Sequence, residues 1–101
     1  MYREIESFAI RADNNLYVEF QSGETGLFDI KPYLKSEFFS ELKNEVYFSR
    51  AYLEFGVISW PNGQDISPDT IFHEMKAVSR PEGITLRYKH YGSMEEPNTN
   101  E

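Results

Sequence analysis

Asp65, Asp69 and His73 are the residues of this chain whose types and spacing could support a reaction. Positions 69 and 73 are four apart, so on a helix their carboxylate and imidazole would be neighbours. Such a pair could bind a metal ion or act as an acid–base pair. A small metal-binding or hydrolytic enzyme that uses these three residues is therefore one interpretation of the chain.

Each of the three side chains also has an ordinary structural explanation. Asp69 would lie in the first turn of a helix, where the helix dipole favours an anion. Asp65 could hydrogen-bond the loop backbone, and His73 could be a surface residue. The chain contains no glycine-rich phosphate loop and no nucleophile elbow. We therefore favour a non-enzymatic protein, with no catalytic residue, no metal ligand and no cofactor.

The loop before these residues is strongly marked in the sequence. Trp60 ends a β-rich run, because Pro61 cannot donate a hydrogen bond to a sheet. A tryptophan at the end of an apolar strand is expected in the core, although ligand stacking is the alternative. Asn62 and Gly63 suit either a tight reversal with positive φ at both positions or a glycine-containing loop.

The start of the following helix is also marked. Ser67 is expected to cap the helix with its hydroxyl, and Pro68 occupies the first helical position, where a missing N–H costs nothing. Ile66 and Ile71 are spaced to form a hydrophobic staple around the cap. The pattern predicts a helix from Pro68 to about Met75.

Composition indicates one acidic domain with a packed core. The chain has 101 residues, of which 16% are aromatic, and a formal net charge of −7. This charge disfavours direct binding to nucleic acid. Because cysteine, a signal peptide and a membrane-length apolar run are all missing, the expected location is the cytoplasm.

Hydrophobic periodicity predicts a small α+β fold, with a mostly antiparallel sheet built from two β-hairpins and packed by short helices. The hairpins are expected at residues 16–30 and 50–60. Ser36 is expected to cap a further short helix carrying Phe38, Phe39 and Leu42. Residues 1–78 would form one domain, residues 79–91 a possible additional strand, and residues 92–101 a disordered acidic tail.

Three tyrosines are candidates for a partner surface. Tyr17, Tyr52 and Tyr88 fall on strand faces opposite the clearest apolar rows. Aromatic residues are enriched at protein interfaces, but a solvated face carrying amphipathic side chains is an equal alternative. We expect a protein partner or self-association, and no membrane association.

The sequence resembles a small bacterial family, the domain of unknown function numbered 2442. The resemblance covers about residues 5–75 and is carried most specifically by Trp60, Pro61, Asn62, Gly63, Asp65, Pro68 and Asp69. It implies a compact α+β domain of unassigned activity, in some relatives followed by a helix-turn-helix for which residues 76–101 leave no room. Members are often encoded beside another small protein, which suggests an antitoxin-like component of a two-gene pair.

Overall fold

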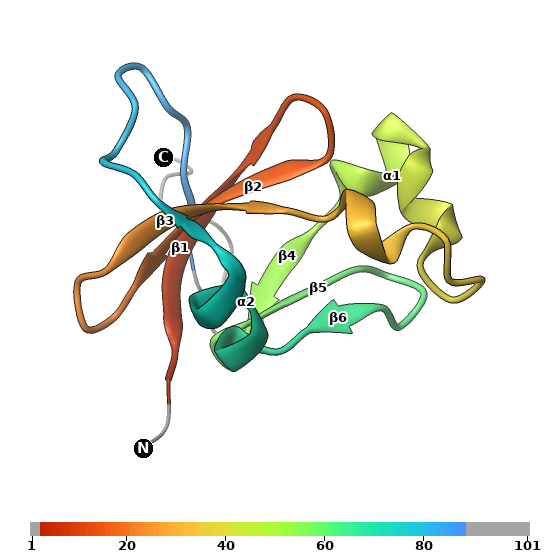
Figure 1. Cartoon of the computed structure of the whole chain (residues 1–101), viewed down its shortest axis with the longest axis horizontal. Coiled ribbons are helices and arrows are strands. Elements are labelled where there is room, and N and C mark those ends of the chain that lie inside the picture. Colours follow the sequence, from red (N-terminus) through yellow and green to blue (C-terminus); the bar gives the residue numbers. More distant parts are fainter. Residues whose placement is uncertain (1–2, 89–101) are drawn as a thin grey trace, which may run out of the picture.

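The structure is a computed structural model that describes residues 3–88. Two antiparallel sheets and a few short helices build the fold (Figure 1). In chain order the elements are β1 (Ile5–Arg11), β2 (Asn15–Phe20), β3 (Thr25–Asp29), the 3-10 helices η1 (Lys31–Tyr33) and η2 (Ser40–Lys43), α1 (Glu45–Phe48), β4 (Tyr52–Glu54), β5 (Val57–Ser59), β6 (Asp65–Ile66), α2 (Pro68–Glu74), β7 (Lys76–Ala77) and β8 (Arg87–Tyr88). The predicted small α+β fold is confirmed.

The larger sheet has five strands in the order β7-β3-β2-β1-β8. Its centre is the meander β1-β2-β3, and the pairing of β2 with β3 confirms the hairpin predicted at residues 16–30. The register of β1 against β2 shifts between Ile5 and Ser7, which marks a β-bulge at the start of the sheet. One face of the meander carries alternating apolar side chains, including Leu16 and Val18, into the core.

The second sheet has three strands in the order β4-β5-β6. Its β4–β5 hairpin confirms the prediction for residues 50–60, so the two predicted hairpins lie in separate sheets. The hairpin turn places Phe55 at φ 53° and Gly56 at φ 77°. A side chain at Gly56 would collide with Glu4, because an ideal Cβ there would lie 2.5 Å from Glu4 Cγ.

The core lies between the two sheets and the helical segments. Trp60 is fully buried there, and its ring stacks on Phe48 with 5.8 Å between the ring centroids. The indole Nε1 donates a hydrogen bond of 2.9 Å to the Phe48 carbonyl, so the buried polar atom of the indole is satisfied. The prediction that Trp60 is a core residue is confirmed.

Helix α2 begins as its sequence signals indicate. The Ser67 hydroxyl accepts hydrogen bonds from the backbone N–H groups of Asp69 and Thr70, and Ile71 is fully buried. The prediction at Ser36 is wrong. Its N–H instead closes a turn by donating to the Tyr33 carbonyl, and the helix that follows is η2, which begins at Ser40 with no side-chain cap.

The residues after the second sheet return to the first. Strands β7 and β8 occupy opposite edges of the five-stranded sheet, so residues 78–86 must cross between them. We call residues 78–86 the strap. Strand β8 pairs with β1 through Ser7 and Phe8 and lies within the additional strand predicted at residues 79–91. Residues 89–91 and the predicted tail at 92–101 lie outside the described residues.

Candidate functional site

The three residues with catalytic potential lie on the surface of β6 and α2. The Asp69 carboxylate accepts a hydrogen bond of 3.2 Å from Arg3, and the His73 ring packs edge-on against Phe72. Asp65 is exposed on β6. Within residues 3–88, no group of three or more His, Cys, Asp and Glu side chains is placed to hold a metal ion.

The loop that joins β5 to β6 is closed by two backbone hydrogen bonds. The N–H of Trp60 donates to the Gln64 carbonyl at 2.8 Å, and the N–H of Gly63 donates to the Trp60 carbonyl at 3.0 Å. Gly63 has φ 101°, whereas Asn62 is not among the residues with positive φ. The loop is therefore the glycine-containing alternative, a turn followed by a glycine bulge, and not a mirror-image reversal.

Gln64 is the polar centre of this site and was missed from the sequence. It is buried, and its Nε2 donates to the Phe38 carbonyl at 3.2 Å and to Glu41 at 3.1 Å. Its Oε1 accepts a hydrogen bond of 2.7 Å from the Tyr47 hydroxyl. The signal that could have found it is alternation, because Gln64 is two residues before the buried Ile66 and so points to the same side.

Two further contacts hold the exposed part of the loop. Asn62 donates from its backbone N–H to the Tyr47 hydroxyl at 2.7 Å, and from Nδ2 to the Glu41 carboxylate at 2.8 Å. The hydrogen bonds from Asn62 and Gln64 hold the pKa of Glu41 below its ordinary value. We call Glu41, Tyr47, Asn62 and Gln64 the loop clamp. It fastens the β5–β6 loop to the helical segments η2 and α1 by polar contacts.

Gly63→Val is expected to lower the free energy of unfolding by about 1 to 3 kcal/mol, because a β-branched residue resists positive φ. A Cβ at this position meets no atom within 4 Å, so the loss would come from backbone strain alone. Urea denaturation followed by circular dichroism measures it. Gly63→Asn should lose less, since asparagine enters positive φ more readily. Equal losses in the two variants would contradict this explanation.

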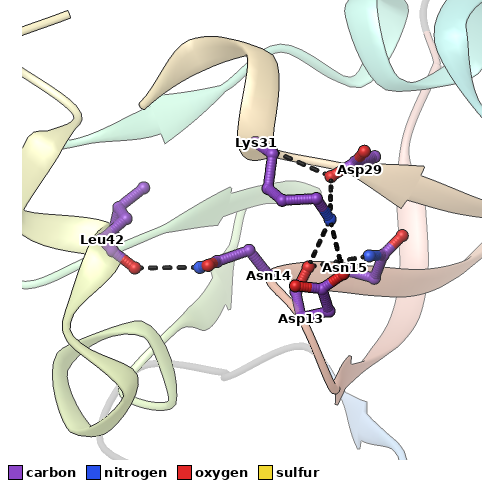
Figure 2. A network of polar contacts seen from close by, with 6 residues as sticks. All are labelled: Asp13, Asn14, Asn15, Asp29, Lys31 and Leu42. Carbon is purple, nitrogen blue, oxygen red and sulfur yellow. Dashed lines mark hydrogen bonds and ion pairs between the residues drawn. The ribbon is translucent and has the colours of Figure 1, made fainter. Parts of the chain in front are cut away.

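A second polar cluster joins the β1–β2 turn to the helical segments (Figure 2). The Lys31 ammonium contacts the Asp13 carboxylate at 3.1 Å and the Asp29 carboxylate at 2.9 Å. Both carboxylates raise the pKa of Lys31, and the hydrogen bond with Asp29 has the larger effect. Asn14 donates a hydrogen bond of 2.9 Å to the Leu42 carbonyl in η2. The cluster is explained as a structural tie between the larger sheet and η1 and η2.

The comparison with protein families decides the assignment. The family described as "protein of unknown function (DUF2442)" matches residues 5–77, which run from β1 to β7. The chain belongs to the DUF2442 family. Comparisons with curated proteins and with solved structures found no match. Among residues 3–88, no helix has both the length and the apolar character needed to cross a membrane.

The strap lies beyond the DUF2442 match and is fastened by a charged pair. Arg80 donates to both carboxylate oxygens of Glu19, at 2.6 and 2.7 Å, and the Tyr17 hydroxyl donates to the same carboxylate at 2.7 Å. The hydrogen bonds from Arg80 are the main cause that lowers the pKa of Glu19. Burial raises the pKa of Tyr17, and the neighbouring Glu19 carboxylate raises it further.

Stability at this pair is expected to depend on pH. Because its pKa is lower in the folded state, Glu19 contributes stability above its unfolded-state pKa and loses it as pH falls through the folded-state pKa. Glu19→Gln should therefore cost about 1 kcal/mol at neutral pH and progressively less in acid. Urea denaturation across the acid range measures this, and a difference from wild type that does not change with pH would contradict it.

The prediction that three tyrosines of this DUF2442 domain form a partner surface is wrong for Tyr17. Tyr17 is fully buried on the face where its hydroxyl and Arg80 of the strap both bond the Glu19 carboxylate, and so it cannot contact a partner. Tyr52 and Tyr88 are 39% and 54% exposed and remain candidates. Phe55, which the sequence analysis did not single out, is 79% exposed at the tip of the β4–β5 hairpin.

Proposed function

We propose that this domain is a non-enzymatic protein-binding or regulatory module that contacts its partner through the tip of the β4–β5 hairpin. The observation that carries the proposal is Phe55. It combines a left-handed backbone conformation with 79% exposure of a large apolar residue. Both features cost free energy in the isolated domain.

The costs can be estimated separately. A non-glycine residue in the left-handed region loses about 1 to 2 kcal/mol relative to a right-handed conformation. Leaving a phenylalanine exposed forgoes the roughly 1.5 to 3 kcal/mol that its burial would contribute. Asparagine or glycine would suit the turn better, as Gly56 shows at the next position. Phe55 departs both from the backbone preference of its residue type and from the tendency of large apolar side chains to be buried. Such a combination at one exposed residue favours a role in binding.

The surroundings of Phe55 indicate the chemistry of the partner. Glu54 is exposed beside it, and Glu4 packs against Gly56 at the same turn. The whole chain carries a net charge of −7. A protein surface with an apolar pocket bordered by lysine or arginine would complement this tip. Tyr52, at the other end of β4, would extend the contact along the strand.

An antitoxin-like role in a two-gene pair is the more specific form of this proposal. In that arrangement the partner would be the small protein encoded by the adjacent gene. The acidic charge supports a basic protein partner and disfavours direct contact with nucleic acid or an anionic membrane surface. Self-association through the same tip is the other form, and it predicts a mass in solution above that of the monomer.

Phe55→Asn is expected to separate binding from stability. Asparagine relieves the backbone strain, so the free energy of unfolding should stay the same or rise by up to about 1 kcal/mol. Binding to the purified product of the adjacent gene, measured by calorimetry, should weaken at least about tenfold if Phe55 is the contact. The mass of the full chain measured by light scattering tests self-association in the same samples.

Val46→Asn provides the matched control. Val46 is 67% exposed on α1, so its replacement removes a comparable exposed apolar group at a different place. We expect wild-type binding from this variant. Equal weakening by both variants, or no complex and a monomeric mass for every variant, would contradict the proposal.

A further inference from the structure

Asn62 of the loop clamp is followed directly in the chain by Gly63, and both residues are exposed. In such a pair, the backbone nitrogen of glycine can attack the side-chain carbonyl carbon of asparagine, because glycine has no Cβ to obstruct the approach. The structure leaves the space around Gly63 open, since even an added Cβ would meet no atom within 4 Å. Asn62 therefore stands where a covalent rearrangement of the backbone is sterically feasible.

We propose that Asn62 is a site of spontaneous, irreversible modification whose rate is controlled by Glu41. The Gly63 nitrogen loses its proton to solvent base and forms a bond to Asn62 Cγ. The bond between Cγ and Nδ2 breaks, and the leaving nitrogen takes up a proton and departs as ammonia. One water molecule then opens the resulting succinimide at either carbonyl, which gives aspartate or isoaspartate.

Three hydrogen bonds oppose this reaction in the folded protein. The attacking N–H of Gly63 donates to the Trp60 carbonyl at 3.0 Å and must leave it before it can be deprotonated. The leaving amide of Asn62 is held by the Glu41 carboxylate at 2.8 Å, and the Asn62 backbone N–H by Tyr47 at 2.7 Å. Since Glu41 fixes the side chain that must rotate toward Gly63, it is the residue that sets the rate.

The product would no longer fit the loop clamp. Hydrolysis replaces the donor amide of Asn62 by a carboxylate, which would lie against the carboxylate of Glu41 and repel it. Isoaspartate also lengthens the backbone within the short loop, which disturbs the pairing of Trp60 with Gln64. The modification would therefore release the loop from η2. This inference is independent of the proposed binding tip at Phe55.

The rate of conversion tests the proposal directly. The purified full chain is incubated at mildly alkaline pH, and peptide mapping by mass spectrometry follows the mass gain and the isoaspartate at position 62. We expect the native protein to convert more slowly than the same chain in urea. Glu41→Ala should accelerate native conversion about threefold to tenfold, since a hydrogen bond to a charged group is lost.

Matched controls distinguish this effect from general loosening. Glu37→Ala removes another exposed carboxylate near η2 and should leave the rate unchanged. Glu41→Gln keeps an acceptor oxygen and should fall between wild type and Glu41→Ala. Asn44 precedes Glu45, not glycine, and serves as an internal control that should not convert. No conversion in urea, or a native rate unaffected or slowed by both changes at Glu41, would overturn the proposal.

A variant that mimics the product tests the consequence. Asn62→Asp is expected to increase hydrogen exchange of the backbone amides in residues 38–43 more at neutral pH than in acid, where protonation of the two carboxylates relieves their repulsion. Asn44→Asp keeps an oxygen that can accept from the Tyr47 N–H and should leave these amides unchanged. Unchanged exchange in Asn62→Asp at every pH would show that the product does not open the loop clamp.

Discussion

Trp60→Ala is expected to lower the free energy of unfolding by about 3 to 5 kcal/mol, the range typical of truncating a large buried aromatic residue. The indole is fully buried and stacked on Phe48, so its removal leaves a cavity between the second sheet and α1. The carbonyl of Phe48 also loses a donor. Urea denaturation followed by far-ultraviolet circular dichroism measures the loss. Tryptophan fluorescence does not serve as the signal, because Trp60 is the single tryptophan of the chain and the variant lacks it.

Trp60→Phe separates packing from hydrogen bonding at this position. It retains an aromatic ring against Phe48 but removes the indole N–H, so we expect a smaller loss of about 1 to 3 kcal/mol. A loss below about 1 kcal/mol for Trp60→Ala would contradict the core assignment and favour the ligand-stacking alternative.

Deletion of residues 80–101 is the second change with a large expected effect, a loss of about 2 to 4 kcal/mol in the free energy of unfolding. The deletion removes Arg80 from Glu19 and uncovers the fully buried Tyr17. It also removes β8, which covers the β1 edge of the larger sheet. An uncovered strand edge favours association between chains, so the mass in solution should rise.

The measurements are urea denaturation and light scattering of the shortened and full chains. Deletion of residues 92–101 alone serves as the control, because it leaves the strap and β8 in place, and we expect wild-type stability from it. If the chain lacking residues 80–101 kept both the stability and the mass of the full chain, the strap would neither stabilise the sheet nor prevent association.

The local elements of this domain could be predicted from the sequence because short-range interactions decide them. The cap at Ser67 depends on N–H groups two and three residues away, and it forms as predicted. The glycine at position 63 was expected in a turn because few other residues tolerate positive φ. Ser36 does not cap a helix because its residue type permits a cap but does not require one. In the structure its N–H closes a turn with the Tyr33 carbonyl instead.

The coverage of each sheet face was decided only by the tertiary structure. Alternation along β2 separates Tyr17 from Leu16 and Val18, but it does not tell whether the second face meets solvent or another part of the chain. The strap joins two opposite edges of the same sheet, and Tyr17 is buried on the face where Arg80 of the strap bonds Glu19, a contact made across more than sixty residues.

The candidate site shows the same division. The sequence by itself determined the presence of a turn, the cap and the core position of Trp60, since each depends on backbone preferences or on apolar pattern. Only the tertiary structure placed Glu41 and Tyr47 against Asn62 and Gln64, because these hydrogen bonds join residues 15 to 23 positions apart. Such pairs depend on how η2, α1 and the β5–β6 loop pack together, and no local pattern records that arrangement.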